Sequence, residues 1–172
     1  MLDAGLEPSI ISGAGLTSII KQGKIGNAYV GKGDWLIIEA DESDRGIMAY
    51  APESTVILNL GHDHDSPERI LEIYVALARS SVKGIVIPED PALASLADQG
   101  VPIQKFSAQD IQTYPDHVTF EYEGHPVKLK VPGAHNAQNA AAAMTLGALY
   151  GCEIPDMIKA ISQFQGVARR FE

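Results

Sequence analysis

The chain has 172 residues, of which 45% are hydrophobic and 20% charged, and its formal net charge at pH 7 is -9. This size allows one sizeable hydrophobic core, and the composition is typical of an ordinary soluble globular protein. The negative charge argues against nucleic acid or an anionic membrane as the partner, because binding to either requires clustered Lys and Arg.

Compartment and membrane association are constrained by three further features. Cys152 is the only cysteine, so no internal disulfide can form and a reducing compartment is expected. The N-terminal residues lack the basic and apolar regions of a signal peptide. The longest nearly apolar stretch, around residues 140–150, is shorter than the roughly 20 residues that a membrane span needs. We therefore expect a cytoplasmic protein without a membrane anchor.

The first third of the chain predicts short strands in glycine-rich surroundings. Residues 1–5 indicate the end of a helix that closes at Gly5. The apolar runs at residues 35–38 and 55–60 are short and rich in Ile, Leu and Val, which is typical of buried strands in a parallel sheet. Extended segments are expected at residues 9–11, 27–30, 35–38 and 55–60.

The remainder of the chain alternates predicted helices and strands. A helix over residues 67–80 follows from Pro67 in its first turn and from an apolar face formed by Ile70, Ile73, Tyr74 and Leu77. The other expected elements are a strand at 83–88, a short helix at 91–98, a hairpin of 118–122 with 127–131, and helices at 135–150 and 155–164. This order predicts an α/β fold, with a mostly parallel sheet, helices on both faces and a small antiparallel hairpin.

Acidic and histidine side chains follow two of the predicted strands. Glu39 opens an acidic run directly after the strand at 35–38, and His64 lies in a polar cluster after the strand at 55–60. If these strands are parallel neighbours, both side chains emerge at one edge of the sheet, where α/β proteins bind ligands. Such a pair suits a divalent cation beside a polyphosphate. The alternatives are acids that begin a helix and a histidine in a surface loop.

The Ala-rich helix begins with a third polar cluster. His135, Asn136 and Asn139 can share one side of its first turns, next to backbone N–H groups that suit a nucleotide. Helix capping is the competing interpretation. Arg169 and Arg170 could hold phosphate or ribose oxygens, or could belong to a solvated linker.

Together, five stretches resemble the Mur ligase family of ATP-dependent ligases. The acidic run and the sequence Pro-Gly-Ala-His-Asn-Ala-Gln-Asn are specific in combination. The matching stretches are residues 4–9, 39–44, 59–64, 132–139 and 164–172, in the family's order and across nearly the whole chain.

The resemblance implies a central, P-loop-NTPase-like ATPase domain at residues 1–166 and a hinge toward a C-terminal domain at 167–172. It implies Mg²⁺ bound by Glu39 and His64, and ATP contacted by His135, Asn136, Asn139 and Arg170. The implied substrates are UDP-N-acetylmuramate and an amino acid, joined through an acyl phosphate in peptidoglycan synthesis.

The chain departs from the family pattern in several places. No Gly-x-x-x-x-Gly-Lys-[Ser/Thr] sequence occurs in it, so it lacks the phosphate-binding loop. Gly61 replaces a common acidic residue, and Asp65 replaces an apolar one. The predicted helix at 67–80 has no lysine, which fits the alanine-adding branch.

Three other functions stay open from the sequence. The first is a ligase that recycles murein peptides, and the second is a folyl-polyglutamate or cyanophycin-type synthetase. The third, from a different class, is a non-catalytic module that binds nucleotide or metal.

Overall fold

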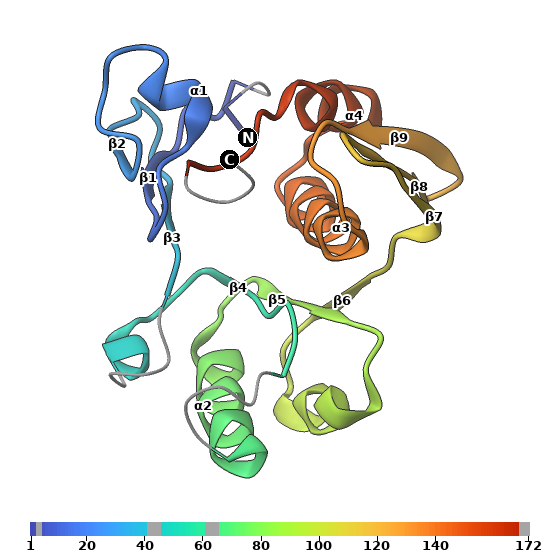
Figure 1. Ribbon diagram of the computed structural model, residues 1–172. Helices are drawn as coiled ribbons and strands as arrows, with labels where there is room; N and C mark the ends of the chain where they lie inside the picture. The colour runs from blue at the N-terminus through green and yellow to red at the C-terminus, as the bar shows by residue number, and fades with distance from the viewer. Residues whose placement is uncertain (3–4, 41–45, 61–65, 169–172) are drawn as a thin grey trace. The chain divides into compact units, whose positions relative to one another are not determined.

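The chain forms a mixed α/β structure, described by a computed structural model for residues 1–2, 5–40, 46–60 and 66–168 (Figure 1). It divides into two compact units. The first unit comprises Met1–Glu39, Ala108–Ala140 and Gly147–Glu172, and the second comprises Ala40–Ser107 and Ala141–Leu146.

The second unit contains a parallel sheet of three strands in the order β4-β5-β6. Helix α2 connects β4 to β5, and a 3-10 helix, η2, connects β5 to β6. The bounds are η1 Gly46–Ala49, β4 Ser54–Val56, α2 Pro67–Ser80, β5 Gly84–Pro88, η2 Pro91–Gln99 and β6 Ile103–Phe106. The predicted parallel sheet with helical crossovers is therefore confirmed.

The bounds of α2 follow from local signals in the sequence. Ser66 caps its N-terminus by accepting a hydrogen bond from the Arg69 amide, and Pro67 stands at the first helical position, where its missing N–H is not needed. Three residues of the predicted face, Ile70, Ile73 and Leu77, are buried, whereas Tyr74 is partly buried. The helix thus begins and ends at the predicted residues.

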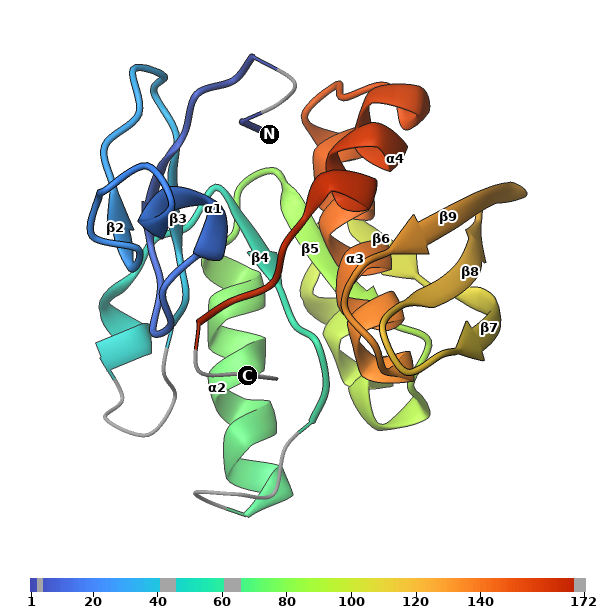
Figure 2. The ribbon, with the colours of Figure 1, turned by 45° about the horizontal axis from the view of Figure 1, so that its top comes forward.

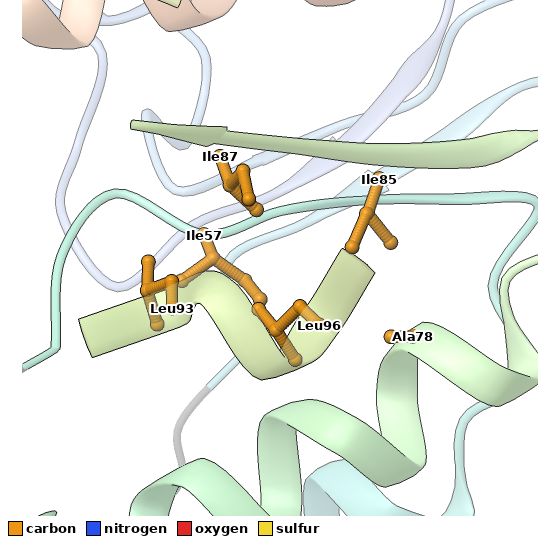
Figure 3. Packing of buried hydrophobic residues seen from close by; sticks show 6 residues of the cluster. All are labelled: Ile57, Ala78, Ile85, Ile87, Leu93 and Leu96. Carbon is orange, nitrogen blue, oxygen red and sulfur yellow. The ribbon is translucent and has the colours of Figure 1, made fainter. Parts of the chain in front are cut away.

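The core of this unit is formed by strand and helix side chains that face each other (Figure 3). Ile85 and Ile87 of β5 point to the same side, where they meet Leu93 and Leu96 of η2. Val86 points to the opposite side and is fully buried as well. Because both sides of β5 are buried, its sequence is almost continuously apolar rather than alternating.

The N-terminal sheet of the first unit has the order β2-β1-β3. Strand β1 (Ser9–Ile11) runs parallel to β3 (Leu36–Ile38) and antiparallel to β2 (Ala28–Tyr29), and the short helix α1 (Thr17–Ile20) follows β1. Gly31 is required beside this sheet, because an added Cβ there would lie 2.0 Å from the Glu7 carbonyl oxygen.

Gly5 lies in a turn of the backbone, where its φ is +75°. The Gly5 amide donates to the Leu2 carbonyl and the Leu6 amide to the Met1 carbonyl, both at 3.1 Å, a pair of bonds that also occurs where helices end. The described residues before β1 contain no assigned helix, so the helix expected to close at Gly5 stays a prediction.

The first unit also contains an antiparallel sheet, β7-β8-β9, against which helix α4 packs at β9 (Figure 2). The predicted hairpin is confirmed, with a tighter turn than expected: Glu123 and Gly124 both have positive φ, as in a type I′ turn. The bounds are β7 Gln109–Thr113, β8 Val118–Tyr122, β9 His125–Leu129, α3 Ala134–Leu149 and α4 Ile154–Gln163.

Three elements were not predicted from the sequence: α1, β6 and β7. Strand β7 is almost entirely polar, and its pairing with β8 rather than a hydrophobic pattern makes it a strand. The strand expected at 55–60 is also shorter, since β4 ends at Val56 and Leu58 is 45% exposed. Within the described residues, no helix is long and apolar enough to cross a bilayer.

Leu96→Ala should lower the free energy of unfolding by about 3 kcal/mol, because Leu96 is completely buried in the core of the second unit and its truncation leaves a cavity. Urea titration followed by circular dichroism measures this. The matched control is Leu58→Ala, which removes the same atoms from an exposed side chain and should cost less than about 1 kcal/mol. Equal losses in the two variants would contradict the packing described for η2.

Candidate functional site

Glu39 extends the parallel pairing of β1 and β3 by one residue. In the register of these strands Ile11 lies opposite Ile38, and the Glu39 amide donates to the Ile11 carbonyl at 2.9 Å. Ser12 and Glu39 are therefore the first residues beyond the carboxyl ends of two adjacent parallel strands. This is the edge at which α/β sheets bind ligands.

The Glu39 carboxylate is held on one side only. Its Oε2 atom accepts a hydrogen bond of 2.9 Å from the Ser12 hydroxyl and one of 2.8 Å from the Gly13 amide. No described residue donates a hydrogen bond to Oε1. The side chain is exposed, so Oε1 can meet a cation without removal of a protein partner.

The loop after β1 also holds the segment that follows α4. The Ala168 amide donates to the Gly15 carbonyl at 2.7 Å, and the Thr17 amide donates to the Gly166 carbonyl at 3.3 Å (Figure 2). An open depression of about 490 Å³ lies at this junction. Its lining is mostly backbone and small side chains: Gly13, Ala14, Gly15, Ile20, Gly26, Asn27 and Ala168.

The strand pairing assumed for the cation site is wrong. Strand β3 pairs with β1, whereas β4 pairs with β5, so the two strands belong to different sheets and different units. Both are parallel strands, as the sequence pattern predicted, but neither is fully buried: Leu36 of β3 is exposed, and the residues of β4 are partly buried. The pattern contained no information about which strand lies next to which. His64 lies outside the described residues, so its position relative to Glu39 stays a prediction.

A complete metal centre is not found in the described part of the chain, where no three His, Cys, Asp or Glu side chains gather. Glu39 offers one carboxylate oxygen of the kind that Mg²⁺ prefers. Arg169 and Arg170 also lie outside the described residues. The described neighbour of these arginines, Ala168, is bound to the same loop that holds Glu39.

The polar cluster at the start of α3 has a mixed role. Asn136 donates from Nδ2 to the Pro132 carbonyl at 2.7 Å, which ties the helix to the turn before it. Helix capping, the competing interpretation, is not supported, because no described side chain caps the N-terminus of α3 at Gly133. Asn139 is exposed, and no described residue hydrogen-bonds to its side chain. His135 is exposed, with its ring close to the Cα of Gly133, where φ is +105°.

Gln138, which was not predicted as a functional or structural residue, fixes the orientation of this helix. Gln138 forms two hydrogen bonds with the backbone of Ala108: its Oε1 accepts from the amide at 3.1 Å and its Nε2 donates to the carbonyl at 3.2 Å. The hydrogen bonds of Ser12 and Gly13 to Glu39 were not predicted either. In all these pairs the two residues lie more than twenty positions apart in the chain, so no local sequence pattern reveals the pairing. The position of Ser12 directly after a strand was the only local signal for these residues.

Sequence comparison finds relatives along the whole chain. It is 29% identical over 99% of its length to the UDP-N-acetylmuramate–L-alanine ligase of Synechocystis sp., and 32% identical over 100% to that of Nostoc sp.. The chain spans 36% and 39% of these two curated relatives, respectively. No family model matches it.

Three of the solved structures with a similar fold are ligases. UDP-N-acetylmuramate–alanine ligase MurC from Thermotoga maritima matches with a TM-score of 0.82 at 23% identity, over 99% of this chain and 41% of the other. The UDP-N-acetylmuramate:L-alanyl-gamma-D-glutamyl-meso-diaminopimelate ligase (MPL) from Neisseria meningitides has a TM-score of 0.79 and 23% sequence identity, and the match covers 98% of this chain and 60% of the other. MurF ligase from Thermotoga maritima, solved with ADP, has a TM-score of 0.61 and 20% sequence identity, and the match covers 91% of this chain and 43% of the other.

Asn136→Ala should lower the free energy of unfolding by about 1 kcal/mol, because it removes the hydrogen bond to the Pro132 carbonyl. Asn139→Ala is the matched control on the same helix. It removes an exposed amide and should change stability by less than about 0.5 kcal/mol. Thermal unfolding of both variants measures the difference, and a larger loss at position 139 would contradict the roles described here.

Proposed function

Because the chain is related to the Mur ligases along its full length, we propose that it is the nucleotide-binding part of an ATP-dependent carboxylate–amine ligase of peptidoglycan synthesis. The proposed reaction joins L-alanine to UDP-N-acetylmuramate in the cytoplasm. One observation carries the proposal: the full-length relationship to proteins named UDP-N-acetylmuramate–L-alanine ligase. Residues 1–166 are proposed as the central domain, and 167–172 as the hinge that follows it.

The proposed reaction proceeds in two steps. A substrate carboxylate oxygen attacks the γ-phosphorus of ATP, which forms an acyl phosphate and releases ADP. The amine nitrogen of the amino acid then attacks the acyl carbon, and inorganic phosphate leaves with the pair of electrons of the broken C–O bond. Catalysis of phosphoryl transfer depends on positioning and on stabilisation of charge, so the task of this chain is to hold the reacting groups.

Glu39 and His64 are proposed to hold Mg²⁺. When bound, this ion neutralises charge on the phosphate oxygens during transfer. The single observation of this structure that supports the fit is the Oε1 atom of Glu39, which is exposed and accepts no hydrogen bond from a described residue. Oxygen is the ligand atom that Mg²⁺ prefers.

His135, Asn136 and Asn139 are proposed to contact the adenine side of ATP, and Arg170 a phosphate or the ribose. The exposed Asn139 amide can donate and accept at once, which matches the edge of an adenine. One of the two Nδ2 hydrogens of Asn136 is used by the Pro132 carbonyl, so Oδ1 and the second hydrogen are what it can offer to the nucleotide.

A second candidate is the recycling of murein peptides. Two solved murein peptide ligases have TM-scores of 0.79 and 0.78 with this chain, close to the 0.82 of MurC, so the fold does not separate the two functions. Phosphate release by the full-length ligase with UDP-N-acetylmuramate decides between them. Release with L-alanine supports the first proposal, release with a murein tripeptide supports recycling, and release with glutamate or folate contradicts both.

The isolated 172-residue chain should hydrolyse or transfer no phosphate from ATP at a measurable rate. It contains no Gly-x-x-x-x-Gly-Lys-[Ser/Thr] loop, and such a loop supplies the backbone cradle and the lysine that hold the β- and γ-phosphates. A coupled phosphate-release assay on the purified chain measures this, with the full-length ligase as positive control. ATP-dependent ligation by the chain alone would refute the prediction.

In the full-length ligase, Asn139→Ala should raise the KM for ATP about five- to tenfold, the equivalent of one hydrogen bond lost. The KM for the amino acid should stay unchanged, because this side chain is assigned to ATP only. Ala143→Ser, one turn further along the same exposed side of α3, is the control. An unchanged KM for ATP in the Asn139 variant counts against the assignment of α3.

A further inference from the structure

We infer that Ser12 is a positioning residue that presents one oxygen of Glu39 to a divalent cation. The inference rests on the proposed function, since it assumes that Glu39 is a cation ligand. It goes beyond that proposal because Ser12 itself does not contact the cation. Its role is to orient the side chain that does.

The parallel pairing of β1 and β3 brings the two residues together. The Glu39 amide is bound to the Ile11 carbonyl at 2.9 Å, which fixes the backbone of both residues at the end of the sheet. The Ser12 hydroxyl then reaches Oε2 of Glu39 at 2.9 Å. The restraint is thus built on two paired strands, although the residues are 27 positions apart in the chain.

The hydroxyl of Ser12 has one hydrogen and two acceptors within reach, Oε2 of Glu39 at 2.9 Å and the Ala14 carbonyl at 3.0 Å. An ionised carboxylate is the stronger acceptor, so it takes this hydrogen. The hydroxyl oxygen lies 3.3 Å from the Ala14 amide and can accept from it. Ser12 therefore connects the loop backbone to the carboxylate.

The two donors act on the same carboxylate oxygen. Ser12 and the Gly13 amide both bind Oε2, which leaves Oε1 as the oxygen for a cation. An exposed Glu side chain otherwise samples many rotamers, and ordering it costs up to about 2 kcal/mol. A carboxylate that is already oriented avoids part of this cost when the cation binds.

The test measures Mn²⁺ binding to the 172-residue chain by electron paramagnetic resonance of the free ion. Binding should be weak, because the phosphate oxygens that complete the coordination shell are absent without nucleotide. Ser12→Ala should weaken it about tenfold, as is typical when the hydrogen-bond partner of a metal ligand is lost. Ser12→Thr, which keeps a hydroxyl, should bind within about twofold of the original chain.

Glu39→Gln separates failure of the inference from failure of the proposed site. If this variant loses Mn²⁺ while Ser12→Ala binds normally, the cation site stands and the role of Ser12 is overturned. If it binds Mn²⁺ as well as the original chain, the proposed ligand itself is wrong. Thermal unfolding of each variant checks that it folds. If Ser12→Ala does not fold, Ser12→Cys, a poorer donor of similar size, should bind more weakly than the original chain.

Discussion

The candidate site depends above all on one backbone hydrogen bond, from the Glu39 amide to the Ile11 carbonyl. It continues the parallel ladder beyond the last paired residues of β1 and β3 and so places Glu39 beside the loop that starts at Ser12. The side-chain restraint on Glu39 follows from this alignment. A change of register by one residue would turn Glu39 to the other face of the sheet and remove both donors from its reach.

The loop after β1 connects three parts of the first unit. Ser12 and Gly13 bind the Glu39 carboxylate, and Gly15 binds the amide of Ala168, close before the arginines at 169 and 170. Backbone atoms make most of these contacts. This explains why the loop needs small residues, since larger side chains would keep the adjoining segments apart.

The start of α3 combines support of the fold with exposed polar groups. Gln138 fixes the helix to the backbone of Ala108, and Asn136 fixes the turn before it, whereas Asn139 lies exposed on the same helix. Neighbouring amides of one motif therefore have different tasks. Those with hydrogen bonds to the backbone hold the helix in place, whereas the exposed Asn139 forms no such bond with a described residue.

The sequence by itself determined the elements whose signals are local. Pro67 and the apolar face of α2 predicted that helix to the residue, and the alternating residues of 118–122 and 127–131 predicted the hairpin. Only the tertiary structure decided what depends on distant partners: the polar strand β7, the separation of β3 and β4 into different sheets, and the hydrogen bonds from Ser12 and Gly13 to Glu39. The physical reason is that capping, turn geometry and periodicity act within a few residues. Strand neighbours and side-chain partners are selected instead by the packing of the whole unit.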